Sequence, residues 1–466
     1  MKEKKTRPVA GLLAGFKPGR KFLFFTLSMV AALVLTLLAR SPGFTDSQNY
    51  VLFLLFFAIG LWVTEAIPPF AVALFIMAYL VVALGSPRFN AEPQDVTKYI
   101  QTFSNSIIWL ILSGFFLAEA MSRTGLDTDF FRFSMKISGH KPKNILLGMM
   151  LTTMVASFVL SNTATTSMMV ASIMPLIRSN PKNPFVKSLL LGIPLAASVG
   201  GMGTIIATPV NAIAVGALEN NGVSVSFLSW MRIGMPLTII LTLTCWLLLS
   251  KLYIGEHTAS SFEMPEIKHN PDDKIKKHRF IVIAVLVVTV SFWLTTSLHH
   301  LSVSAVSVIP IVALTMTGIL RAEDIRKLPW DTLLLVAGGL SLGLSLQETH
   351  LLEHFSRNLV GSPLPPIVLY LIFAYLTMIF GNIMSNTATG TILIPLGIYL
   401  MPDHIKQIAV IIALSASTGI LLPVSTPPNA IAYSTGMIEQ KELLKGGLLV
   451  GLLGPALIVL FAVLWL

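Results

Sequence analysis

SNTATTS at residues 161–167 and SNTATGT at residues 385–391 are two copies of one run of small polar side chains. The copies begin 224 positions apart, and each lies near the middle of a long apolar segment without a charged residue, 145–177 and 358–402. Polar groups in such segments are costly unless they serve the structure or a ligand. The fold and function of this chain therefore depend on why it places this run twice.

The composition is that of an all-α membrane protein with many spans. Of 466 residues, 54% are hydrophobic and 12% are charged, whereas a soluble domain carries roughly 25% charged residues. Many apolar runs approach or exceed the ~20 residues that cross a bilayer. The runs lie near residues 22–39, 49–67, 69–85, 105–122, 145–177, 188–217, 231–250, 280–297, 303–320, 330–346, 364–401, 407–437 and 444–466. The net charge of +10 lies in short loops, where it orients the chain in the membrane and does not indicate a nucleic-acid partner.

The distribution of Lys and Arg predicts the side that each loop faces. The basic N-terminal segment is expected in the cytoplasm by the positive-inside rule. Segment 145–177 has basic residues on both flanks, and as one helix it would be about 50 Å long, well beyond a ~30 Å apolar core. It is therefore predicted to be a re-entrant hairpin that opens to the cytoplasm, and 364–401 a second hairpin that opens outside. The count gives eleven transmembrane helices plus two re-entrant hairpins, with the C-terminus outside.

Three landmarks recur in the same order and identify an internal repeat. Besides the polar runs, Gly114 and Gly338 lie 224 positions apart, and ATPVNAIAVG (207–216) matches STPPNAIAYS (425–434). Each unit holds five spans and one hairpin, and an odd number of spans places the copies in opposite orientations. Inverted repeats are typical of alternating-access transporters. The predicted organisation is a cytoplasmic N-terminus with the first transmembrane helix (1–44), a first repeat (45–250), a basic cytoplasmic linker (251–279) and a second repeat (280–466).

The residue types at the two hairpin tips and two helix breaks suit a ligand site. Ser, Asn and Thr cap helix N-termini, and a tip also presents free carbonyls from its first arm and free N–H groups from its second. Carbonyl ends attract a small cation such as sodium, and N–H ends attract a carboxylate. Pro209, Pro427 and Pro428 break the helices at TPVN (208–211) and TPPN (426–429). The alternative is that the motifs only cap the tips and kink the helices, but two tips and two breaks in matching order favour a binding site.

Residues absent from these segments limit the chemistry. Neither hairpin and neither break contains Lys, Arg or His, so hydroxyls, amides and helix dipoles would hold an anion. The sequence has no zinc-protease, nucleophile-elbow or P-loop motif, and its single cysteine, Cys245, forms neither a disulfide nor a cysteine metal site within one chain. No enzyme activity is expected. Two other classes are an intramembrane hydrolase, which needs a catalytic dyad in a span, and a channel, whose transport rate would not saturate with substrate.

The chain resembles the divalent anion/sodium symporter family, which includes the bacterial dicarboxylate transporters. The resemblance covers nearly the whole chain and rests on the paired SNT motifs, the T-P-x-N breaks, WVTEAIPP near the start and NSIIWLILSGFFLAEAMSRTGLD at 105–127. It implies a homodimer in which each protomer has a scaffold domain and an elevator-type transport domain that carries both hairpins.

The resemblance also implies site residues at both tips and both breaks. One sodium site resembles Ser157, Ser161, Asn162 and the backbone of Ala207. The second resembles the backbone around Gly381 and Met384 with Asn386 and Ser425. The substrate carboxylates would be held by Asn162, Thr163 and Thr208 from the first half and by Asn386, Thr387, Thr426 and Pro427 from the second.

Two departures from the family pattern bear on sodium. The first break reads Ala-Thr-Pro-Val-Asn from Ala207, where the family often has Gly-Ser/Thr-Pro-Pro-Asn, and Gly381 stands where a hydroxyl residue is common.

The expected function is secondary active transport of C4 and C5 dicarboxylates such as succinate, malate, fumarate or 2-oxoglutarate across the bacterial inner (cytoplasmic) membrane. Sodium is the expected coupling ion, and no other cofactor is expected. Sodium-independent dicarboxylate exchange and transport of sulfate or another inorganic oxyanion are the alternatives.

Overall fold

The computed structural model describes residues 19–466 apart from 91–92, 127–128, 130–131, 133–135, 137, 180–182, 255–272, 352–363 and 424. Most of the N-terminal segment before the first span and most of the 251–279 linker therefore lie outside the described residues. The described residues form helices, with no strand among them. The α-helices are α2 (Arg20–Ala39), α3 (Asp46–Thr64), α4 (Pro69–Gly85), α5 (Thr97–Gln101), α6 (Ser106–Thr124), α8 (Pro142–Ala156), α9 (Asn162–Ser179), α10 (Pro184–Gly200), α11 (Pro209–Asn220), α12 (Phe227–Tyr253), α13 (Asp273–Leu294), α14 (Thr296–His299), α15 (Val303–Met316), α16 (Ala322–Arg326), α17 (Trp330–Glu348), α19 (Pro366–Ile383), α20 (Asn386–Leu400), α21 (Ile405–Ala416), α22 (Pro427–Ser434) and α23 (Gln440–Trp465).

These helices form a multi-pass membrane protein, which confirms the predicted all-α class. Seven helices in the described part are long and apolar enough to cross a membrane, or eight if one bent pair is a single span. Three further predicted spans coincide with shorter apolar helices, α4, α10 and α15. The count of eleven crossings remains a prediction, because several of the segments are broken or short.

The predicted hairpins and breaks appear as helix interruptions at the expected places. The first hairpin is α8 and α9, which pack together and are joined by residues 157–161; the second is α19 and α20, joined by residues 384–385. Proline begins five of the helices around these features, where its missing N–H costs nothing. The two breaks separate α10 from α11 and α21 from α22. Local sequence therefore explains where each interruption falls.

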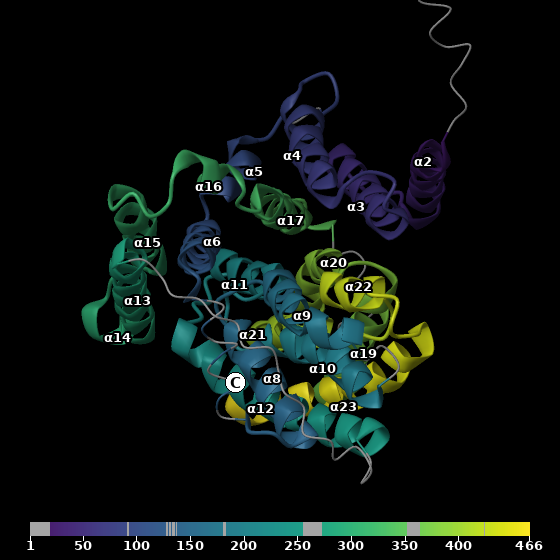
Figure 1. The fold of residues 1–466 in the computed structure, drawn as a ribbon. Coiled ribbons are helices and arrows are strands. Elements are labelled where there is room, and N and C mark those ends of the chain that lie inside the picture. The colour runs from purple at the N-terminus through teal and green to yellow at the C-terminus, as the bar shows by residue number, and fades with distance from the viewer. Residues whose placement is uncertain are drawn as a thin grey trace, which may run out of the picture.

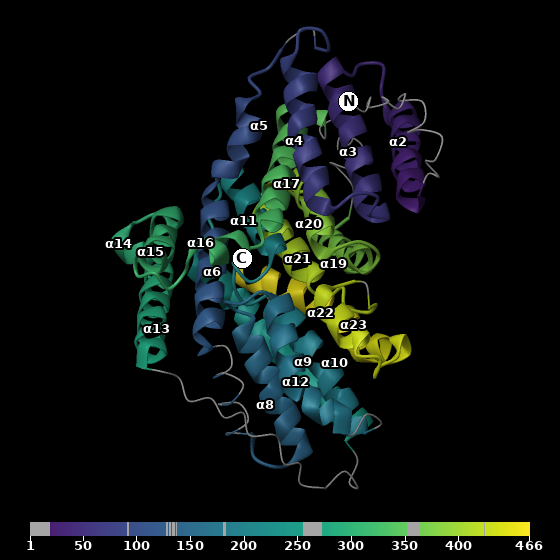
Figure 2. The ribbon, with the colours of Figure 1, turned by 45° about the horizontal axis from the view of Figure 1, so that its top comes forward.

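The helices form two groups. The hairpin group consists of α8–α12 and α19–α23, in which the hairpins and broken helices pack mainly on one another. The scaffold group consists of α2–α6 and α13–α17 and lies along one side of the hairpin group (Figure 1). In both views α2–α4 stand at one flank of the scaffold group and α13–α15 at the other (Figure 2). Helices α6 and α17, with α5 and α16, run between these flanks.

Packing in the two halves follows the repeat. Helix α4 packs on α17, and its counterpart α15 packs on α6. Within the hairpin group, α11 of the first half packs on α20 of the second, and α22 of the second packs on α9 of the first. The short helices carry matching ion pairs with reversed charges: Lys98 of α5 pairs with Glu348 of α17, and Asp324 of α16 pairs with Arg123 of α6. The internal repeat is therefore visible in the packing as well as in the sequence.

One set of contacts departs from this symmetry. Helix α11 packs on α6 and α17, and α20 also packs on α17, whereas α22 and α9 make no comparable contact with the described scaffold helices. Every residue from Val210 to Leu218 in α11 is buried, but Pro427, Ala430 and Tyr433 in α22 are exposed. The scaffold group thus covers one end of the hairpin group and leaves the repeat-related end uncovered.

Candidate functional site

The first hairpin tip lies against the first helix break. Ser161 Oγ accepts a hydrogen bond from Ala164 N at 3.2 Å, so this serine caps α9 as its motif predicts. A Cβ placed on Gly201, directly after α10, would lie 2.7 Å from Asn162 Nδ2 and 2.6 Å from Thr208 Cγ2. Glycine therefore permits the close approach of Asn162 and Thr208, and the tip and the break meet at this point.

The second tip repeats this arrangement. Ser385 Oγ accepts a hydrogen bond from Ala388 N at 3.2 Å and caps α20. A Cβ on Gly381 would lie 2.8 Å from Asn386 Oδ1 and 3.6 Å from the Cα of Gly419, the repeat counterpart of Gly201. The asparagine of each tip thus packs close to glycine, between a hairpin and a broken helix.

Several side-chain oxygens at the tips are buried without a hydrogen-bond partner among the described residues, including Thr165 Oγ1 and Thr166 Oγ1 in the first polar run. Three of them belong to the predicted site residues. They are Ser157 Oγ, Asn162 Oδ1 and Asn386 Oδ1. Leaving such an atom unsatisfied costs about 1–3 kcal/mol. A cation at each tip would satisfy these oxygens, and oxygen donors with unwound carbonyls are the ligands that sodium takes in broken helices. The residues present therefore fit a small cation.

The second helix of each hairpin begins at a tip, and the second half of each broken helix begins at a break. Helices α9, α11, α20 and α22 start at Asn162, Pro209, Asn386 and Pro427, and each N-terminus carries a partial positive charge with free N–H groups. Thr208 and Thr426 cap α11 and α22 through their hydroxyls. This arrangement suits anions without any fixed cationic side chain.

The predicted site residues differ in accessibility. Thr163 and Pro427 are exposed, whereas Asn162, Thr208, Asn386 and Thr387 are half-buried. The candidates for backbone or hydroxyl coordination are buried: Ala207, Gly381, Met384, Ser425 and Thr426. The structure brings Asn162 and Thr208 together, and Gly381 and Asn386 together. Among the described residues, no hydrogen bond joins the substrate candidates of one half to those of the other. These residues remain proposals as ligands.

The two tips differ at one repeat-equivalent position. Ser157 and Gly381 are 224 residues apart, as the two motifs are. Ser157 is fully buried, and its Cβ lies 3.1 Å from where a Cβ on Gly200 would stand. At the second tip Gly381 supplies no side-chain oxygen. The first tip therefore offers one more side-chain ligand to a cation than the second.

Sequence reasoning missed the residues that hold the breaks open. Asn211 Nδ2 donates to the carbonyls of Gly201 and Thr204, both at 2.8 Å. Asn429 Nδ2 likewise donates to Ile420 O at 2.9 Å and Leu422 O at 3.0 Å. The signal in the sequence is the final Asn of each T-P-x-N motif. These asparagines satisfy carbonyls that the interrupted helices leave unpaired.

A further asparagine serves only the second break. Asn382 Oδ1 accepts a hydrogen bond from Leu421 N at 2.7 Å, and its Nδ2 donates to Met378 O at 2.8 Å. Its repeat equivalent is Phe158, whose carbonyl accepts a hydrogen bond from Thr204 Oγ1 at 2.6 Å. The two breaks are thus held in similar shapes by different side chains.

The chain is similar to known transporters over nearly its whole length. The family described as "Sodium:sulfate symporter transmembrane region" matches residues 20–466. The chain is similar to the sodium-dependent dicarboxylate transporter SdcS of Staphylococcus saprophyticus, with 30% identity over 92% of this chain and 88% of the relative. The same transporter of Staphylococcus aureus is 29% identical over 98% of this chain and 92% of the relative.

Among solved structures, the YdaH transporter of Alcanivorax borkumensis has a similar fold. The TM-score is 0.57 at 12% sequence identity, over 85% of this chain and 97% of that chain. At this identity the likeness concerns the fold alone. It agrees with the all-helical fold of the described residues.

Proposed function

Because the chain belongs to the sodium:sulfate symporter family, we propose that it is a secondary active transporter that moves C4 and C5 dicarboxylates with sodium as the coupling ion. The relatives SdcS are sodium-dependent dicarboxylate transporters, which supports both the substrate class and the ion. The observation that carries the proposal is the pair of unpartnered, buried oxygens of Asn162 and Asn386 at equivalent places in the repeat. Succinate, malate, fumarate and 2-oxoglutarate are the proposed substrates.

One substrate carboxylate would bind at each tip. Asn162, Thr163 and Thr208 would hold one end of the substrate, and the other end would be held by Asn386, Thr387, Thr426 and Pro427. The four helix N-termini supply partial positive charge for a dianion. A dicarboxylate has two acidic ends, which matches a site built from two similar halves.

Sodium would bind beside each tip. The first site would use Ser157, Ser161, Asn162 and the backbone of Ala207. The second would use Asn386, Ser425 and the backbone around Gly381 and Met384. Bound cations would offset the substrate charge in a site without Lys or Arg, so binding of the two solutes would be coupled by their mutual attraction.

Transport would proceed by an elevator movement of the hairpin group against the scaffold group, within a homodimer in the bacterial inner membrane. The one-sided packing of α11 and α20 on α17 supports a movable boundary between these groups. The proposed orientation has the N-terminus in the cytoplasm and the C-terminus outside, with hairpin 145–177 opening inward. In that orientation the uncovered end with α22 faces the cytoplasm. The repeats are proposed to span 45–250 and 280–466.

The test is uptake of labelled succinate into proteoliposomes with and without an inward sodium gradient. We expect uptake that needs the gradient, and we expect Asn162→Ala and Asn386→Ala to abolish it. The matched control is Asn49→Ala in α3, because Asn49 also has a buried, unpartnered Oδ1 but lies outside the hairpins. Near-normal uptake by both folded tip variants would overturn the proposed site.

Two observations favour specific alternatives. The family description names sulfate, so labelled sulfate should be tested in the same vesicles. Gly381 removes a possible sodium ligand, which favours a chain that exchanges dicarboxylates without a sodium gradient. Uptake that occurs only with unlabelled dicarboxylate inside the vesicles would establish that mechanism.

A further inference from the structure

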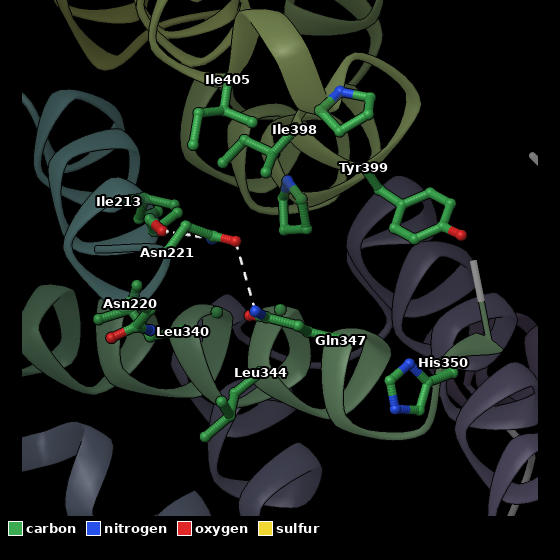
Figure 3. A pocket seen from close by; sticks show the side chains of 15 residues that line it. Ile213, Asn220, Asn221, Leu340, Leu344, Gln347, His350, Ile398, Tyr399 and Ile405 are labelled. Atoms are coloured by element: carbon green, nitrogen blue, oxygen red, sulfur yellow. Dashed lines mark hydrogen bonds between the residues drawn. The ribbon is translucent and has the colours of Figure 1, made fainter. Parts of the chain in front are cut away.

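A cavity of about 500 Å³ lies between the scaffold group and the hairpin group, away from both tips. Its walls come from α11, α17, α20 and the segment that leads into α21 (Figure 3). None of the proposed substrate or sodium residues lines it. The cavity is therefore a partly open space, separate from the proposed site, at the boundary between the two groups that the proposed movement would displace.

The boundary around the cavity is tightly packed. A Cβ on Gly343 of α17 would lie 3.1 Å from Pro395 Cγ of α20, and one on Gly339 would lie 2.8 Å from Thr391 Cγ2. Glycine at these places lets the two helices approach closely beside the cavity. At its polar side Gln347 Nε2 of α17 donates to Asn221 Oδ1, just after α11, at 3.3 Å. This hydrogen bond joins the two groups directly (Figure 3).

The lining is mostly apolar, with a small set of polar groups. Leu340, Leu344, Ile398 and Ile405 contribute aliphatic surface. Asn220, Asn221, Gln347, His350 and Tyr399 provide amide, imidazole and phenol groups, and the lining residues include no Asp, Glu, Lys or Arg. Pockets of 300–1,000 Å³ at domain boundaries with few polar groups are the usual form of small-molecule sites. An uncharged head group with an aliphatic chain matches this lining better than an anion does, because most of the lining is aliphatic and it contains no Lys or Arg.

We propose that this cavity binds a neutral single-chain amphiphile of the monoacylglycerol type, with the chain against the aliphatic wall and the hydroxyls toward Gln347 and Asn221. A molecule seated there contacts both groups. Its occupancy would favour the arrangement in which α11 and α20 pack on α17 and disfavour every arrangement that separates them. The amphiphile would therefore act as an inhibitor at a site distinct from the substrate site. This effect on uptake, unlike binding, rests on the proposed transport function.

Binding is tested with a monoacylglycerol that carries a diazirine in its acyl chain. The purified full-length protein in lipid nanodiscs is illuminated with the probe, and labelled peptides are mapped by mass spectrometry. We expect label on Leu340, Leu344 or Ile398, displaced by excess unlabelled monoacylglycerol and reduced at least fivefold in Ile405→Trp, which fills the cavity. The matched control is Ile367→Trp, because Ile367 is an exposed isoleucine of α19. A fatty acid with the same diazirine tests the requirement for a neutral head.

Three results would overturn the binding proposal. They are label confined to lipid-exposed residues such as Ile367, equal labelling of Ile405→Trp and the wild type, and equal labelling of the cavity by the fatty acid. Inhibition is measured separately as succinate uptake with and without monoacylglycerol. We expect the wild type and Ile367→Trp to be inhibited and Ile405→Trp to be resistant; equal inhibition of all three would overturn the inhibitory role. Because labelling needs no transport, it decides the site even if succinate is not a substrate.

Discussion

Asn386 Oδ1 lies 2.8 Å from the point where a Cβ on Gly381 would stand, and this oxygen has no hydrogen-bond partner among the described residues. The atom in the way is the end of a side chain, so a small residue at 381 needs only a shift of the Asn386 amide. Gly381→Ser would then supply the hydroxyl that Ser157 supplies at the first tip. We expect the half-saturating sodium concentration for succinate uptake to fall by about fivefold, which corresponds to 1 kcal/mol. Gly381→Ala adds the same Cβ without oxygen, and an equal effect of both substitutions would contradict this assignment.

The contact between Asn221 and Gln347 provides a test of movement. Replacing both by cysteine in a Cys245→Ala background allows a short thiol cross-linker to join the hairpin group to the scaffold group. We expect the cross-link to stop succinate uptake and reduction to restore it. The control pair is Lys187 and Glu442, whose Nζ and Oε1 atoms lie 2.8 Å apart within the hairpin group. If the Asn221–Gln347 cross-link forms fully and uptake continues, the two groups do not move against each other there.

The asparagines of the breaks are expected to stabilise the fold. Asn429→Ala leaves the carbonyls of Ile420 and Leu422 without their donor, at a cost of about 2 kcal/mol or more. We expect a lower unfolding temperature for Asn429→Ala and for Asn211→Ala. Thermal unfolding in detergent, monitored by tryptophan fluorescence, measures it. Asn49→Ala is the comparison, because Asn49 donates one hydrogen bond, to Thr45 O at 3.0 Å. Equal unfolding temperatures for all three variants would show that the breaks are held by other contacts.

The two ion pairs of the short scaffold helices should differ in their contribution. The Asp324 side chain is 2% exposed and also accepts a hydrogen bond from Arg321 N at 2.9 Å, whereas the Glu348 side chain is 40% exposed. Asp324→Ala removes the buried acceptor of Arg123 and leaves the backbone N–H of Arg321 without its partner, at a cost of about 1–3 kcal/mol. Glu348→Ala should cost less than about 1 kcal/mol, since exposed pairs are weak. The unfolding temperatures of the two variants are compared. A larger decrease for Glu348→Ala than for Asp324→Ala would contradict the expected order.

Much of this architecture is predictable from residue patterns because membranes impose strict rules. Uncharged segments that are too long for one helix predicted both hairpins, and prolines predicted both breaks. Other features depend on which atoms meet after folding. That Asn211 reaches Gly201 and Thr204 cannot be read from spacing alone, and neither can the cavity beside Gly343 and Pro395. The unequal coverage of the two ends is also absent from the sequence, because both copies of the repeat have the same order of elements.

Gly216 of α11 faces Leu340 of α17 so closely that a Cβ on the glycine would lie 3.0 Å from Leu340 Cδ2. The repeat places Ser434 and Phe116 at the equivalent positions. If the proposed elevator movement brought α22 onto α6 as α11 now lies on α17, Ser434 and Phe116 would meet where α11 and α17 have a glycine and a leucine. In such a state α22 and α6 would stand further apart than α11 and α17 do here, so the two states would not be mirror images. An empty transporter would then spend unequal times with its site open to the two sides of the membrane, and this resting bias would be set by pairs of side chains that touch neither substrate nor sodium.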